Sequence, residues 1–216
     1  MIGFIFATLK EAGPFLKYIN AQKINDKPFL QLRGGLDSAK NSFWVVICGI
    51  GKVAAAAATQ YMICRYKMQR IINAGVCGTV NENSTAFQKG MVFLVSQAVE
   101  GDHGVFGIRP SPICCAIDLF LDLPRGRLIT NDLPVFEPKH KNEHKNKLPV
   151  SSGDLVDMEG AAVARIAALN QVPCTLIKGI TDFAAENGRK DLHFNLPDVS
   201  KKIARVLIEG LWLKNY

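Results

Sequence analysis

Short apolar runs alternate along this chain with longer stretches in which apolar residues recur at helical spacing. The runs predict strands at 2–7, 44–48, 70–73, 91–96, 128–130, 155–157 and 175–180. The clearest helical stretches are 53–66, 159–169 and 199–213. Strands that are apolar on both faces and alternate with helices predict an α/β fold with a largely parallel central sheet. In such folds ligands bind at the carboxyl ends of the strands.

Length and composition are those of one ordinary globular domain. The 216 residues, 48% hydrophobic and 21% charged, contain nothing that reads as a linker, so a single domain over 1–216 is expected. No apolar run is long enough to span a membrane, and the N-terminal stretch has neither a basic leader nor a cleavage site. The six cysteines form no CxxC pair, so we expect reduced core residues and a cytoplasmic protein without a membrane partner.

The net charge of +7 raises the question of nucleic acid binding. The lysines are scattered, however, and the densest basic segment, KHKNEHKNK at 139–147, carries no aromatic residue that could stack on a base. This segment is expected to be a solvated loop, and no nucleic acid partner is predicted. Its His140 and His144 stand four positions apart, but the lysine-rich surroundings do not favour a metal site.

The segment CGIGKVAAAAATQ at 48–60 looks at first like a phosphate-binding loop. It matches neither GxGxxG nor GxxxxGK[ST], so Gly49 and Gly51 are expected to serve a tight turn from strand to helix. Phosphate binding by this loop is the lesser alternative.

Carboxylates recur where predicted strands end. Glu11 follows the first strand, Glu159 directly follows the strand LVDM, which contains Asp157, and Asp182 ends TLIKGITD. Each one alone is explained as a helix cap or a first-turn carboxylate. Together they predict one pocket for acid and base chemistry on a neutral, hydroxylated substrate, in which one carboxylic acid protonates a leaving group and one carboxylate activates water. The chain has no GxSxG motif, and none of its four histidines adjoins a serine or cysteine in a known catalytic pattern.

Four segments in this order and spacing carry a resemblance: GIGKVAAAAATQ, INAGVCGTV, VDMEGAAVARIA and KGITDFAAENG. They resemble the nucleoside phosphorylase and nucleosidase superfamily, in particular the methylthioadenosine/S-adenosylhomocysteine nucleosidases. The similarity runs over nearly the whole chain. It implies a three-layer α/β/α fold with a mixed, largely parallel central sheet.

The resemblance also implies roles for individual residues. Glu159 would accept hydrogen bonds from the ribose 2′- and 3′-hydroxyls, with Met158 packing on the sugar. Glu11 would activate water, and Asp182 would protonate purine N7. Asp157 would then be only a helix cap. The remaining substrate-binding residues would be Val76, Cys77, Gly78, Val135, Thr181 and Phe194.

Phosphorylases of the same superfamily usually place an arginine before the turn that matches GVCG, and others near the N-terminus. This chain has Asn73 at the first position and no arginine before Arg33. Because a phosphate dianion is poorly held without a guanidinium, we expect water to be the nucleophile. No metal or organic cofactor is implied.

The purine pocket departs from the nucleosidase pattern, with Val76 where a serine is usual and Pro134-Val135 where Phe-Ile is usual. The backbone of Val135 would face the purine edge. The stacking aromatic is left open among Phe106, Phe136 and Phe183.

The stretches INAG and HFNLPD are also similar to the futalosine hydrolases of menaquinone synthesis. Those acting on hypoxanthine tend to carry asparagine where this chain has Asp182, which favours an adenine base, as in methylthioadenosine, S-adenosylhomocysteine or aminofutalosine. The predicted partner is a purine nucleoside, and the resemblance implies a homodimer. A catalytically inactive relative is the non-enzyme alternative.

Overall fold

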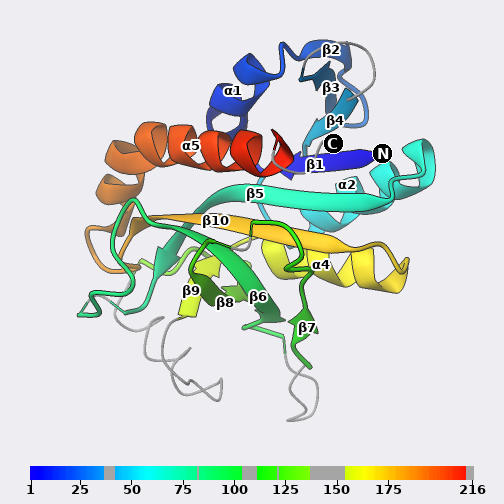
Figure 1. The fold of residues 1–216 in the computed structure, drawn as a ribbon. Helices are drawn as coiled ribbons and strands as arrows, with labels where there is room; N and C mark the ends of the chain where they lie inside the picture. The colour runs from blue at the N-terminus through cyan, green and yellow to red at the C-terminus, as the bar shows by residue number, and fades with distance from the viewer. Residues whose placement is uncertain (37–41, 82, 104–110, 121, 137–153, 213–216) are drawn as a thin grey trace.

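The computed structural model describes residues 1–36, 42–81, 83–103, 111–120, 122–136 and 154–212. The elements in chain order are β1 (Ile2–Phe6), α1 (Leu9–Tyr18), β2 (Gln22–Asn25), β3 (Leu30–Gly35), β4 (Ser42–Ile47), α2 (Lys52–Tyr66), β5 (Arg70–Thr79), β6 (Val92–Glu100), β7 (Ile113–Cys114), β8 (Arg125–Thr130), β9 (Asp154–Asp157), α4 (Gly160–Leu169), β10 (Cys174–Asp182) and α5 (Gly188–Trp212). Figure 1 shows their arrangement.

The sheet is mixed and partly closed. Strand β1 lies parallel between β4 and β5, and β3 and β2 extend the β4 side in antiparallel fashion. On the other side, β5 pairs with both β10 and β9, and β6 and β8 join those two strands into a closed ring of five. The long β5 and β10 run side by side through the middle of the molecule (Figure 1).

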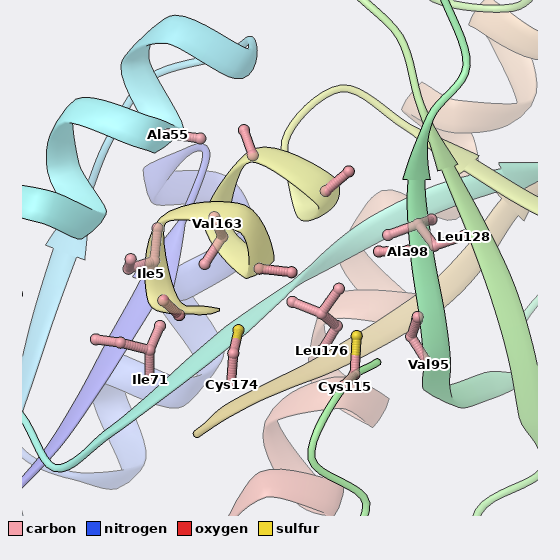
Figure 2. Close-up of a cluster of buried hydrophobic side chains, with 14 of the residues drawn as sticks. Ile5, Ala55, Ile71, Val95, Ala98, Cys115, Leu128, Val163, Cys174 and Leu176 are labelled. Atoms are coloured by element: carbon pink, nitrogen blue, oxygen red, sulfur yellow. The ribbon is translucent and has the colours of Figure 1, made fainter. Parts of the chain in front are cut away.

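Helices cover the sheet on opposite faces, as strand alternation requires. Phe4 and Phe6 of β1 belong to the core cluster that includes Phe15 of α1 and Leu207 of α5. Ile5 between them belongs to the cluster that includes residues of α2 and α4. Figure 2 shows this second cluster, in which Ala55 and Val163 lie with Ile71, Cys174 and Leu176. The small alanine side chains let α2 and α4 lie close to the strands.

Each strand and helix predicted from periodicity is present, although boundaries moved. The structure adds β2, β3 and β7, the helix α1 and the first half of α5. Helix α1 was hidden by Gly13 and Pro14, which disfavour a helix interior. It forms because a capping box between Thr8 and Glu11 starts it and because Ala12 and Phe15 are buried against the core.

One expectation about local structure was wrong. We expected GVCG to form a turn, but Gly75 to Gly78 continue β5, which runs to Thr79 and pairs with β10 along this length. The pairing with β10 keeps these glycines extended despite their low strand propensity.

The cysteines are all free. Four of them are buried, as predicted for core residues: Cys48, Cys77, Cys115 and Cys174. The other two, Cys64 and Cys114, are exposed.

Among the residues that the structure describes, no helix is both long and apolar enough to cross a membrane.

Candidate active site

A cavity of about 270 Å³ opens where β1, β5, β9 and β10 end. Its lining residues are Ala7, Thr8, Glu11, Ile50, Val76, Cys77, Gly78, Pro134, Val135, Phe136, Val156, Asp157, Met158, Glu159, Asp182, Leu192 and Leu196. The three carboxylates predicted at strand ends, Glu11, Glu159 and Asp182, are all among them, so the structure brings these acidic side chains to one pocket, which Asp157 also lines. The rest of the lining is mainly apolar, which leaves the carboxylates as its chemically active groups.

Glu11 is fixed by three hydrogen-bond donors. The Thr8 amide and the Thr8 hydroxyl donate to Oε2 at 2.9 and 2.8 Å, and the Val76 amide donates to Oε1 at 3.0 Å. The capping box at the start of α1 therefore also orients a pocket carboxylate. Because a carboxylate accepts about four hydrogen bonds, one acceptor position on Oε1 is left to receive a proton from water.

Asp182 ends β10 beside an irregularity in its pairing with β5. Its Oδ1 accepts a 2.9 Å hydrogen bond from the Ala184 amide, and its Oδ2 lies 2.9 Å from the Thr181 hydroxyl. Burial raises the pKa of the Asp182 carboxyl, although these two hydrogen bonds oppose the rise. The Thr181 hydroxyl also lies 3.2 Å from the Cys77 carbonyl, so it can donate there while accepting from a protonated Asp182.

Glu159 precedes α4 as its N-cap residue. Its Oε1 accepts a 2.8 Å hydrogen bond from the Gly51 amide, which comes from the turn between β4 and α2. Burial raises the pKa of Glu159 to about 7, and the nearby Asp157 adds to the rise, while Lys178 and the Gly51 amide oppose it. Among the described residues, Gly51 is the hydrogen-bond partner of this carboxylate, which leaves Oε2 for a ligand.

Asp157 is more than the helix cap that the sequence predicted. Its Oδ2 does accept from the Gly160 amide at 2.9 Å, as a cap would. The same oxygen also lies 2.8 Å from Lys178 Nζ, and Thr130 donates to Oδ1 at 2.6 Å. Both side chains of the ion pair are nearly inaccessible to solvent. Burial alone would lower the pKa of Lys178, but Asp157 and Glu159 outweigh it, so the pKa is raised and the ammonium stays charged.

Sequence reasoning missed Lys178. A lysine inside TLIKGITD, the strand that is buried at every position, was the available signal. Gly75 on the adjacent strand makes room for Glu11, since a Cβ there would lie 2.8 Å from Glu11 Oε1, whereas Lys178 Nζ at 3.8 Å would be in ordinary contact. Lys178 therefore places one positive charge behind Glu11, Asp157 and Glu159.

The structure places most of the other predicted residues at the pocket. Met158, Val135, Val76, Cys77 and Gly78 line it. Thr181 is fully buried beneath it and acts on Asp182 as described.

The pocket does not include Phe194, whose side chain is 84% exposed on α5, because that face of the helix points to solvent. Leu192 and Leu196, two positions away on either side, line the pocket instead.

Of the three phenylalanines considered for stacking on the purine, one lines the pocket among the residues that the structure describes. Phe136 lines the pocket. Phe183 instead lies under Lys89, whose Nζ is 4.7 Å from the ring centroid. Phe106 falls outside the described residues, as do His140 and His144.

Nothing cationic lines the cavity among the residues that the structure describes. Asn73 is buried in β5, where its amide donates to the Ile5 carbonyl at 3.0 Å. The turn of Gly49 and Gly51 has positive φ angles, as a tight turn requires, and its Gly51 amide is used by Glu159. These features favour a neutral ligand over a phosphate at this end of the sheet.

The family model described as "Phosphorylase superfamily" matches residues 1–211. A 5'-methylthioadenosine/S-adenosylhomocysteine nucleosidase of Buchnera aphidicola is 23% identical over 226 residues, which cover 95% of this chain and 94% of the relative.

Two solved structures are similar over 97% of this chain and 97% of their own, each with a TM-score of 0.87 and 21% identity. One is the 5'-methylthioadenosine/S-adenosylhomocysteine nucleosidase of Neisseria meningitidis in complex with methylthio-immucillin-A, and the other is a futalosine hydrolase mutant of Helicobacter pylori. These likenesses confirm the predicted fold.

Proposed function

Because the chain belongs to the phosphorylase superfamily, whose model matches residues 1–211, we propose that it is a purine nucleosidase. It would hydrolyse the N-glycosidic bond of a 5′-substituted adenosine, such as methylthioadenosine or S-adenosylhomocysteine, and release adenine. The family resemblance predicted from the sequence motifs is confirmed by the match. The name of the Buchnera relative supports the same activity.

One observation carries this proposal: buried carboxylates in different surroundings share an otherwise apolar pocket. Asp182 has a raised pKa, which suits a proton donor. Glu11 accepts three hydrogen bonds and has one acceptor position left for a proton from water. Hydrolysis of a glycosidic bond needs both of these roles.

The mechanism follows from the charges that develop when the bond breaks. The departing purine gains negative charge and the sugar becomes oxocarbenium-like. A proton delivered by Asp182 to purine N7 removes the charge from the leaving group. Glu11 takes a proton from the water that attacks the sugar. Glu159, held by the Gly51 amide, offers Oε2 to the ribose hydroxyls.

A futalosine-type nucleoside is the second candidate substrate. The nucleosidase from Neisseria and the futalosine hydrolase from Helicobacter superpose on this chain equally well, so the fold does not distinguish the two activities. In the family resemblance, hydrolases that act on hypoxanthine tend to carry asparagine at the position of Asp182, so this aspartate favours adenine-type substrates, among them aminofutalosine. The preferred substrate would assign the enzyme to methionine salvage or to menaquinone synthesis.

The protein is proposed to act as a cytoplasmic homodimer without a metal or organic cofactor. Exposed apolar side chains beside the pocket support a second copy as partner, since Ile50, Val53 and Leu133 are 63%, 84% and 67% exposed. Sedimentation of the purified protein would measure its oligomeric state.

The activity is tested by incubating the protein in phosphate-free buffer with methylthioadenosine, S-adenosylhomocysteine, aminofutalosine and futalosine separately. Released adenine or hypoxanthine is quantified by chromatography, and each reaction is repeated with added phosphate. Base release without phosphate is expected. Release only with phosphate would identify a phosphorylase, and no release from any substrate would favour the inactive relative.

A further inference from the structure

Lys52 connects loops that follow three different strands. It is the first residue of α2, directly after the turn that ends β4. Its Nζ lies 2.5 Å from Asp102 Oδ1, beyond the end of β6, and 3.2 Å from Asp132 Oδ2, beyond the end of β8. Asp102 Oδ2 also accepts a 2.6 Å hydrogen bond from the Asp132 amide. We call these three residues the Lys52 clasp.

The clasp joins two walls of the pocket. On one side, Lys52 stands two positions after Ile50, which lines the cavity. On the other side, Asp132 stands two positions before Pro134, which also lines it. Separation of the ammonium from its carboxylates would therefore let these walls move apart.

The clasp is also connected to Glu159 through the backbone amide of Gly51. Gly51, between Ile50 and Lys52, donates its amide to Glu159 Oε1 at 2.8 Å. Gly49 and Gly51 have φ angles of +91° and +102°, and α2 has no side-chain cap at its start. A Cβ on Gly51 would meet nothing within 4 Å, so no packing confines the turn at that point. Backbone hydrogen bonds from the Gly49 amide to the Ala7 carbonyl and from the Ala55 amide to the Gly51 carbonyl hold the turn. The ion pairs of Lys52 add the side-chain contacts next to the Gly51 amide.

The surroundings make the ion pair with Asp102, whose side chain is 29% exposed, stronger than an ordinary surface pair, whereas Asp132 is 64% exposed. The Lys52 side chain is only 14% exposed, and two carboxylates share it. Burial by itself would lower the pKa of Lys52, but its hydrogen bonds with Asp102 and Asp132 outweigh this and raise the pKa. Burial would raise the pKa of Asp102, yet the bond from Lys52 lowers it.

We propose that Lys52 is a positioning residue, which acts through the Gly51 amide to hold Glu159 in place for the ribose hydroxyls. This inference rests on the proposed nucleosidase activity. Since the ribose hydroxyls are held in both the ground state and the transition state, loss of the clasp should weaken substrate binding more than it slows the chemical step.

The test compares Lys52→Met, Lys52→Arg and Asp102→Asn with wild type on the best nucleoside substrate. We expect Lys52→Met and Asp102→Asn to raise KM about tenfold with kcat within about twofold of wild type. Lys52→Arg should restore most of the affinity because it keeps the charge. The matched control is Arg70→Met, which removes an equally buried cation paired with Asp118 at the other end of β5.

A purely structural role for Lys52 would make Lys52→Met behave like Arg70→Met, with loss of stability or active fraction and an unchanged KM. That outcome would overturn the inference.

A double-mutant cycle with Glu159→Gln tests the route of the effect. If Lys52 acts through Glu159, the KM increase caused by Lys52→Met should shrink to less than about twofold in the Glu159→Gln background. Independent, additive effects would contradict this route. Failure of the proposed function is distinguishable, because wild type itself would then release no base from any nucleoside.

Discussion

Lys178 Nζ lies 2.8 Å from Asp157 Oδ2, and neither side chain is more than 2% exposed. This pair is the only ion pair buried to that degree among the described residues. It lies behind the pocket, between the strand that ends in Asp182 and the segment that carries Glu159. The pocket carboxylates Glu11, Asp157 and Glu159 thus surround a positive charge that is shielded from solvent.

Lys178→Met should destabilise the fold by about 3–5 kcal/mol, because it leaves the Asp157 carboxylate buried without its partner. Urea unfolding measures this change. The double variant Lys178→Met with Asp157→Leu should recover part of the loss, since it removes both charges. Lys23→Met, which breaks an exposed ion pair with Asp26, is the control and should cost less than about 1 kcal/mol. A Lys178→Met protein as stable as this control would show that the buried Asp157 carboxylate does not need the charge of Lys178.

Asp182→Asn should keep the fold and lower kcat for adenine nucleosides by about 10²- to 10⁴-fold. The amide still accepts from the Ala184 N–H but has no proton to give to purine N7. Steady-state assays measure the rate, and circular dichroism checks the fold. Wild-type turnover by this variant would show that Asp182 is not the acid.

Glu159→Gln should change how stability depends on pH. In wild type the pKa of Glu159 rises from 4.5 to about 7 on folding. Between these pH values the unfolded chain loses the proton that the folded chain keeps, so the free energy of unfolding falls as pH rises.

Glutamine is neutral at every pH in this range, so the variant does not have this fall in the free energy of unfolding. The stability of the variant relative to wild type should therefore grow by on the order of 3 kcal/mol from pH 4.5 to above pH 7. Denaturant unfolding across this range measures the difference, and a difference that is constant with pH would contradict the raised pKa. The same variant should bind the ribose more weakly, so its KM should rise and its kcat/KM should fall.

Gly78→Ala should impair proton donation by Asp182, although it replaces no charged residue. A Cβ at Gly78 would lie 2.7 Å from Asp182 Oδ1, closer than atoms normally approach. The carboxyl must then move, and turnover should fall about 10- to 100-fold. Gly13→Ala in α1, where a Cβ meets nothing within 4 Å, is the control and should leave kcat unchanged. Equal activity of the two variants would show that the position of Asp182 tolerates displacement.

Local sequence patterns determined most of the fold and part of the site. Apolar runs such as those of β1 and β10 show their burial directly, because a strand with both faces covered needs an uninterrupted apolar sequence. Because these apolar runs mark where the strands end, the sequence also showed that Glu11, Glu159 and Asp182 stand at strand ends. Their meeting in one pocket followed from the rule that strand ends converge.

Only the tertiary structure decided what holds these carboxylates. Val76 donates to Glu11 across 65 positions of sequence, and Gly51 donates to Glu159 across 108. The donors are backbone amides, which every residue except proline carries, so no side-chain pattern could single them out. Lys178 stands out only by its place in an apolar strand, and the sequence does not show that Asp157 is its partner or that Lys52 pairs with Asp102. The sequence therefore determined which groups could react, whereas the packing of distant strands decided their partners, orientation and protonation.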